Sequence, residues 1–172
     1  MGPGADDATD HQVREAELVG LGLARAGVPV ICGGLFGVMD GVARGVRAGG
    51  GDVTGVVPGA DVLIANPALT HVIAACGAGE MRNQVIVVSS AALVVALVVV
   101  GMNPGTAMEV LMAVSRKLGK PAFGVNVDVL CGSHRLDSMT LPRDVDGDPA
   151  WSQAVRAATA VALGEHRPRS AD

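Results

Sequence analysis

Two glycine-rich loops contain the residues of this sequence whose types and spacing are best suited to chemistry. The first glycine loop is residues 33–37 and the second glycine loop is residues 101–106. Glycine lets backbone N–H groups approach a phosphate closely, and a helix that begins after such a loop adds the positive end of its dipole. Thr106 also supplies a hydroxyl, and Phe36 is the one aromatic residue near either loop. The loops therefore predict a site for a phosphate-bearing small molecule.

Each loop falls between a predicted strand and a predicted helix. The first loop joins a strand at 28–32 to a helix at 38–48, and the second joins a strand at 92–100 to a helix at 106–118. The remaining predicted elements are a helix that begins after a Thr9–Gln12 capping box and ends at Gly27, strands at 53–57, 71–74 and 121–127, and helices at 80–90 and 150–163. This alternation predicts an α/β fold with a Rossmann-like, doubly wound parallel sheet and helices on both faces. Ligands of such sheets bind beyond the carboxyl ends of the strands.

Composition limits the classes of protein to which the chain can belong. Hydrophobic residues make up 49% of its 172 residues and charged residues 17%, which predicts one folded domain at 1–165 with a flexible tail at 166–172. A net charge of −4 provides no basic surface for nucleic acid. The apolar run 85–100 is too short for a membrane span and is interpreted as the end of a helix followed by a buried strand. We therefore expect a cytoplasmic protein.

Other familiar sites are not supported by the spacing of the residues they need. The sparse cysteines Cys32, Cys76 and Cys131 have no zinc spacing and fit a reducing compartment. Asp144, Asp146 and Asp148 alternate as in a calcium loop, but the closing glutamate is absent, so no metal site is predicted. The first loop also lacks the acidic residue of a dinucleotide site about 20 positions on, and neither loop continues as a P-loop.

Four short segments resemble the LOG (lonely guy) superfamily, once labelled lysine decarboxylases. They are Cys32-Gly33-Gly34 with Gly37-Val38-Met39, Gly79-Glu80-Met81-Arg82-Asn83, Gly105-Thr106-Ala107-Met108-Glu109, and Gly119-Lys120-Pro121. Classical members cleave the N-glycosidic bond of nucleoside 5′-monophosphates, including cytokinin nucleotides, with an arginine and a glutamate. The matching residues here are Arg82 and Glu109. A guanidinium can hold a phosphate and a carboxylate can stabilise an oxocarbenium-like sugar, whereas the alternative is an ion pair between two helix starts.

Two departures from the enzyme pattern resemble molybdenum cofactor (Moco) carrier proteins, which share the LOG-like fold. They are the opening Met1-Gly2-Pro3-Gly4 and the Gly-Met-x-Pro-Gly-Thr-Ala-x-Glu pattern of residues 101–109. The resemblance implies non-catalytic proteins that hold a phosphorylated pterin cofactor as cargo and pass it on, often as homo-oligomers, with no cofactor needed for catalysis. The expected ligand- or phosphate-binding residues are Gly2, Pro3, Gly33, Gly34, Phe36, Gly37, Met39, Asn83, Gly101, Met102, Asn103, Pro104, Gly105 and Thr106. Asp61 and Asn66 lie in a loop that faces the expected site.

Three functions remain open at this point. The first is a carrier or storage protein for Moco or a related nucleotide-like ligand. The second is a LOG-type phosphoribohydrolase that uses Arg82 and Glu109, and the third is a ligand sensor or a structural member of the superfamily. Gly41 and Gly45, four residues apart in a predicted helix, favour close helix packing and a homodimer or tetramer. The resemblance also implies a central strand ahead of Met1, so we expect either a start further upstream or another segment in that place.

Overall fold

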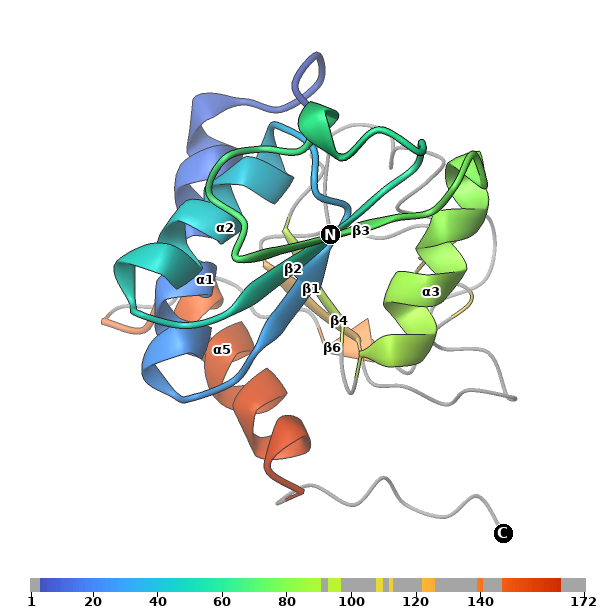
Figure 1. The fold of residues 1–172 in the computed structure, drawn as a ribbon. Coiled ribbons are helices and arrows are strands. Elements are labelled where there is room, and N and C mark those ends of the chain that lie inside the picture. Colours follow the sequence, from blue (N-terminus) through green and yellow to red (C-terminus); the bar gives the residue numbers. More distant parts are fainter. Residues whose placement is uncertain are drawn as a thin grey trace, which may run out of the picture.

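The computed structural model describes residues 4–90, 93–96, 108–109, 112, 122–125, 139–140 and 147–164. Its helices are α1 (Asp10–Arg25), α2 (Val38–Ala48), α3 (Arg82–Ser89) and α5 (Ala150–Ala162), with short 3-10 turns η1 (Val62–Ile64) and η2 (Gly79–Met81). Its strands are β1 (Val30–Cys32), β2 (Val53–Val57), β3 (His71–Ala74), β4 (Leu93–Ala96), β5 (Ala122–Val125) and β6 (Met139–Thr140). Figure 1 shows how these elements are arranged. The predicted bounds of α2, β2 and β3 are confirmed to the residue.

All strand pairs in the described residues are parallel, which confirms the predicted α/β fold class. The strands form two three-stranded sheets, ordered β1-β2-β3 and β4-β5-β6. Val30 pairs with Val53 and Thr54 with His71, so β2 is central in the first sheet. β1 and β4 are end strands of their sheets, and α1 contacts both of them, so one helix spans the two sheets. Neither β6 nor η1 was predicted.

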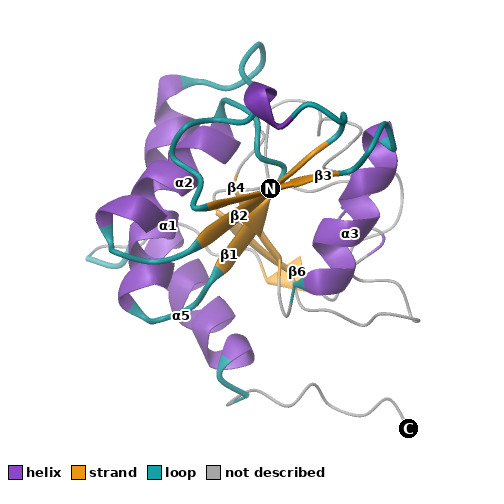
Figure 2. Ribbon diagram, in the orientation of Figure 1, coloured by secondary structure: helices purple, strands orange, loops and turns teal. Residues whose placement is uncertain are grey.

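Helices cover both faces of the strands. Helices α1, α2 and α5 lie on one side and α3 lies on the other (Figure 2). The carboxyl end of β2 is fully buried at Val56 and Val57, and α3 contributes the buried Ile86 and Val87 from its side. Burial of these aliphatic side chains supplies about 1.5–3 kcal/mol each. The near absence of aromatic residues is therefore compensated by a tightly packed valine, alanine and isoleucine core.

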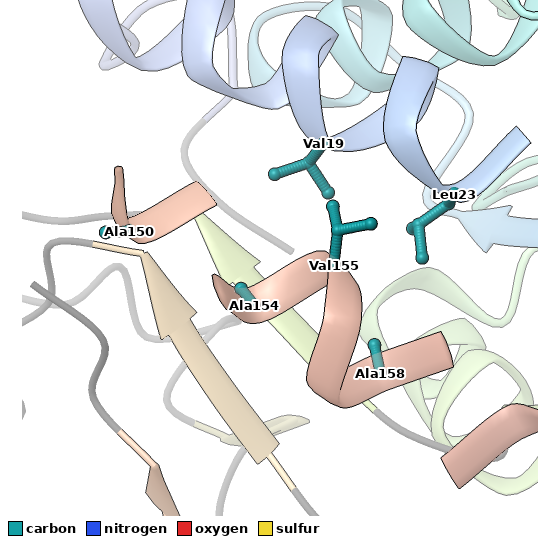
Figure 3. Packing of buried hydrophobic residues seen from close by; sticks show 6 residues of the cluster. All are labelled: Val19, Leu23, Ala150, Ala154, Val155 and Ala158. Atoms are coloured by element: carbon teal, nitrogen blue, oxygen red, sulfur yellow. The ribbon is translucent and has the colours of Figure 1, made fainter. Parts of the chain in front are cut away.

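α5 packs against α1 and also contacts β4 and β5. Val19 and Leu23 of α1 surround Val155 of α5, and Ala154 and Ala158 lie on the same face of α5 (Figure 3). Alanine at these positions lets the helix axis approach its neighbours closely. The cluster also includes Ala150, and Val28, Val30, Trp151, Ala157 and Val161 pack against it.

The start of α1 follows from its sequence as predicted. The Thr9 hydroxyl accepts a hydrogen bond from the Gln12 N–H at 3.3 Å, and the Gln12 side chain accepts one from the Thr9 N–H at 2.7 Å. This reciprocal pair is a capping box, which satisfies two N–H groups that a helix start leaves without partners. At the other end Gly27 has φ of 73°, as its predicted role in ending the helix requires.

Glycines allow α1 and α2 to pack backbone against backbone. A methyl group at Gly45 would overlap the Glu17 carbonyl oxygen, and one at Gly41 would lie 2.5 Å from the Val13 carbonyl oxygen. On α1, a methyl at Gly20 would overlap the Val42 carbonyl oxygen. The small-residue face of α2 is therefore occupied within the chain. It cannot be the reason for self-association that the sequence suggested.

Several predictions fall outside the described residues. These are the site residues Gly2, Pro3 and 101–106, Cys131, Asp144 and Asp146, the tail 166–172 and most of the predicted helix 106–118. Within that predicted helix, Met108, Glu109 and Met112 are helical. The apolar run 85–100 begins inside α3 and includes β4, as predicted. Among the helices that the structure describes, none combines the length and apolar character that a bilayer crossing needs.

Candidate ligand-binding site

The first glycine loop connects the carboxyl end of β1 to the start of α2. Gly34 and Gly37 both have φ of 75°, a region that residues with a side chain rarely adopt. Gly37 is the N-cap of α2 and makes no side-chain cap hydrogen bond. The first N–H groups of α2 are therefore directed toward the loop without a capping side chain, and the positive end of the helix dipole lies there.

Arg82 links the beginning of this loop to strand β2 through hydrogen bonds. Its guanidinium Nη1 donates hydrogen bonds to the carbonyl oxygens of Gly33 and, at 2.8 Å, Val56. Arg82 is the first residue of α3 and is buried, with 8% of its surface exposed. The Arg82 side chain thus connects the carboxyl ends of β1 and β2 from the face of the sheet that α3 covers, opposite to α2 (Figure 2).

Arg82 also explains why residue 33 is glycine. A methyl group there would lie 2.6 Å from the Met39 sulfur and 2.8 Å from Arg82 Nη1. The space that a side chain would fill is therefore taken by Met39 and the guanidinium. Three of the predicted site residues, Gly33, Met39 and Arg82, are brought together in this way.

Asn66 holds the middle of the loop. Its backbone N–H donates to the Gly34 carbonyl at 2.9 Å, and its side-chain Nδ2 donates to the Leu35 carbonyl at 2.7 Å. Its Oδ1 accepts a hydrogen bond from the Ala68 N–H at 3.2 Å. With 2% of its surface exposed, Asn66 lies beneath the loop. The sequence predicts that Asn66 lies in a loop facing the site, and the pair Asn66-Pro67 is typical of a fixed turn. Only the folded structure reveals the hydrogen bonds that Asn66 makes to the glycine loop.

The loop carbonyls therefore point toward the protein interior. Gly33, Gly34 and Leu35 are consecutive, and each of their carbonyl oxygens accepts a hydrogen bond from Arg82 or Asn66. In a trans peptide the N–H points opposite to the C=O. The N–H groups of Leu35 and Phe36 consequently point away from Asn66, and no acceptor for them occurs among the described residues. Two aligned N–H groups beside a helix start can bind an anion.

Cys32, the last residue of β1, directly precedes the loop and responds to the same electrostatic environment. Burial raises the pKa of the Cys32 thiol, and the Gly34 backbone N–H and the Arg82 charge oppose this rise more weakly. The thiol is therefore neutral near pH 7. The nearby guanidinium adds positive potential to that of the α2 dipole, which favours a negatively charged ligand.

The remaining predicted site residues differ in exposure. Phe36 is half-exposed at 48%, so its ring is open to a planar ligand. Asn83 follows Arg82 in α3 and is buried, and Glu109 is buried in a helical stretch. Asp61 is exposed and caps η1 by accepting a hydrogen bond from the Leu63 N–H. The ligand roles of these residues stay predictions.

Comparisons with known proteins find one relative by sequence and several solved structures with a similar fold. An uncharacterized protein of Archaeoglobus fulgidus is 36% identical over 133 residues, which cover 77% of this chain and 83% of that protein. The molybdenum cofactor carrier protein of Chlamydomonas reinhardtii is 30% identical, with a TM-score of 0.76 over 93% of this chain and 95% of its own. The molybdenum cofactor binding protein of the phototrophic bacterium Rippkaea orientalis is 25% identical, with a TM-score of 0.71 over 84% and 86%.

The model of the SLOG cluster4 family matches residues 1–142, which span both glycine loops and the segments that carry the sequence resemblance. The predicted LOG-like, Rossmann-type relationship is therefore confirmed. On this match, the chain belongs to the SLOG cluster4 family.

Proposed function

We propose that this protein binds the molybdenum cofactor as cargo and acts as a carrier or storage protein for it. The observation that carries the proposal is the structural match to the Chlamydomonas reinhardtii carrier, which extends over 93% of this chain. The local geometry supports it, because the first glycine loop directs two N–H groups and a helix start away from the protein interior. A phosphorylated pterin needs such donors for its phosphate.

In the proposed complex the phosphate lies against the N–H groups of Leu35 and Phe36 and the start of α2. The ring of Phe36 stacks on the planar pterin, and the second glycine loop provides further backbone donors. Arg82 keeps the loop in place through the Gly33 carbonyl and adds its charge to the site. Every one of these roles is binding or orientation, so the proposed function needs no catalytic step.

The experiment that tests the proposal is an anaerobic binding assay with Moco. Purified protein is incubated with the cofactor, separated from free cofactor by gel filtration and analysed for bound pterin by fluorescence after oxidation. We expect bound pterin in wild type and a loss in Gly37→Ala, because alanine is strained at φ of 75° in the loop. Gly50→Ala is the matched control, since Gly50 has φ of 73° at the other end of α2 with open space around it.

A parallel assay with AMP distinguishes this proposal from the phosphoribohydrolase alternative. A carrier releases no adenine from AMP. Adenine release that disappears in Glu109→Gln, together with no retention of Moco by wild type, would contradict the carrier proposal and assign the chemistry to Arg82 and Glu109.

The proposal includes self-association in the cytoplasm as a homodimer or tetramer. Apolar side chains are exposed on four elements that follow one another in the chain: Leu63 of η1, Val72 and Ile73 of β3, Met81 of η2, and Val85 and Val88 of α3. Covering such surface is a common reason for a protein to self-associate. Light scattering at micromolar concentration measures the mass, and a monomer there would contradict this part of the proposal.

A further inference from the structure

The hydrogen bonds that Asn66 donates to the glycine loop both go to loop carbonyls. Its backbone N–H binds Gly34 and its side-chain amide binds Leu35, from beneath the loop and across 31 residues of sequence. The opposite side of the same peptides carries the N–H groups that are directed outward. The orientation of these N–H groups therefore depends on a side chain that lies on the other side of the loop.

The chemistry of the contact requires an asparagine. The side chain donates from Nδ2 to Leu35 and accepts at Oδ1 from the Ala68 N–H, so it needs a donor and an acceptor at the same reach. Aspartate has the acceptor but not the donor. The following Pro67 restricts the backbone of Asn66 to extended conformations, which limits the directions in which the side chain can point.

We infer that Asn66 is a positioning residue for phosphate binding: it holds the Gly34 and Leu35 carbonyls inward so that the N–H groups of Leu35 and Phe36 face the phosphate. The inference rests on the proposed function for the site, and it extends that function by naming a residue that sets the geometry of the loop without contacting the ligand. In this arrangement Arg82 fixes the first carbonyl of the loop and Asn66 fixes the next two.

The test compares Asn66→Asp with a matched control, Thr70→Val. Asp keeps the shape of the side chain and the acceptor for Ala68 but places a second oxygen against the Leu35 carbonyl. Thr70 lies in the same β2–β3 connection, and its hydroxyl bonds the backbone N–H and carbonyl of Val53 at 2.7 and 2.8 Å. Asn66→Asp removes one part-buried hydrogen bond between a side chain and the backbone and Thr70→Val removes two, but only the first substitution affects the loop.

The first measurement is an NMR titration of each full-length variant with inorganic phosphate, followed at the backbone N–H signals of Leu35 and Phe36. In wild type and Thr70→Val we expect these signals to shift on phosphate addition. In Asn66→Asp we expect altered starting positions and a Kd at least about tenfold higher. Absence of phosphate-induced shifts in wild type, or equal Kd values in wild type and Asn66→Asp, would overturn the inference.

A second variant covers the case in which Asn66→Asp does not fold. Serine in Asn66→Ser can still accept the Ala68 N–H as in a serine turn, but its short side chain does not reach Leu35. The same rise in Kd is expected, and an unchanged Kd in this folded variant overturns the inference.

The second measurement is anaerobic Moco retention by the same proteins. Retention by wild type and Thr70→Val with loss in Asn66→Asp supports both the inference and the proposed function. Equal retention by Asn66→Asp and wild type overturns the inference alone. Failure of wild type to retain Moco, with a phosphate response that depends on Asn66, overturns the proposed function and leaves the inference standing.

Discussion

The guanidinium of Arg82 donates a 2.8 Å hydrogen bond to the backbone carbonyl of Val56, near the carboxyl end of the buried strand β2. The same nitrogen binds the carbonyl of Gly33, so the first residue of α3 joins the carboxyl ends of two parallel strands. An arginine that the sequence suggests as a ligand or catalytic residue therefore also has a structural task. The positive charge of Arg82 and its hydrogen bonds to the two strands contribute to the same candidate site.

Replacing Arg82 should lower the stability of the fold. In Arg82→Met the buried carbonyls of Gly33 and Val56 lose their donor, and each unsatisfied buried group costs about 1–3 kcal/mol. We expect the free energy of unfolding in urea to fall by about 2–4 kcal/mol. The control is Arg14→Met, because Arg14 is exposed on α1 and its loss should change the free energy by less than about 0.5 kcal/mol. Equal stabilities of the two variants would disprove the structural role of Arg82.

The Gly45→Ala substitution tests whether α1 and α2 pack backbone against backbone. A methyl group there overlaps the Glu17 carbonyl, so α1 and α2 must move apart in Gly45→Ala although alanine favours the helix. We expect a loss of about 1–3 kcal/mol, measured as a lower Tm. Gly59→Ala is the control, since the nearest atom to its added methyl is 3.8 Å away. A Tm that rises in Gly45→Ala would contradict the close packing.

The capping box at Thr9 should contribute measurably to stability. Thr9→Ala removes the acceptor for the Gln12 N–H, and the loss of such a cap costs about 1 kcal/mol. Thr9→Ser keeps a hydroxyl at the same position and should retain most of the wild-type stability. Urea unfolding followed by circular dichroism distinguishes the two, and identical midpoints for alanine and serine would show that the cap contributes nothing.

Phe36 should affect ligand binding and leave stability nearly unchanged. Its ring is half-exposed on the glycine loop, so Phe36→Ala removes little buried surface from the free protein. Loss of stacking on a pterin should raise the Kd about fivefold to tenfold, which corresponds to about 1–1.4 kcal/mol. Leu63→Ala serves as the control, because Leu63 is 88% exposed on η1 and outside the loop. Equal Kd values for Phe36→Ala and wild type would exclude stacking by this ring.

Cys32 and Cys76 should differ in reactivity with pH. Burial raises the pKa of the Cys32 thiol, whereas Cys76 is exposed, so iodoacetamide at pH 8 should modify Cys76 first. Because the folded state holds the Cys32 proton more tightly than the unfolded state does, the contribution of Cys32 to stability is complete below the unfolded pKa, about 8.5, and falls as the pH rises above it. Mass spectrometry of labelled peptides measures the order of modification. Faster labelling of Cys32 than of Cys76 would contradict the burial.

Local sequence patterns determined most of the elements and the family. Helix α2 lies between glycines at 37 and 49, and both of its predicted ends are confirmed because glycine favours helix ends at any position in a fold. The capping box at Thr9 is equally local. The motif order around both glycine loops was sufficient to predict a LOG-like α/β protein, since these glycines and their following helices are close in the sequence.

Only the tertiary structure decided what the side chains around the loop contact. Asn66 lies 31 residues from Leu35 and Arg82 lies 49 residues from Gly33, and no local spacing indicates such pairs. In the same way, Gly41 and Gly45 suggested a surface for a second copy, but the fold places α1 against them. The physical reason is that hydrogen bonds and packing depend on distance in space. The sequence shows which groups can donate, accept or allow a close approach, and the parallel sheet decides which of those groups meet.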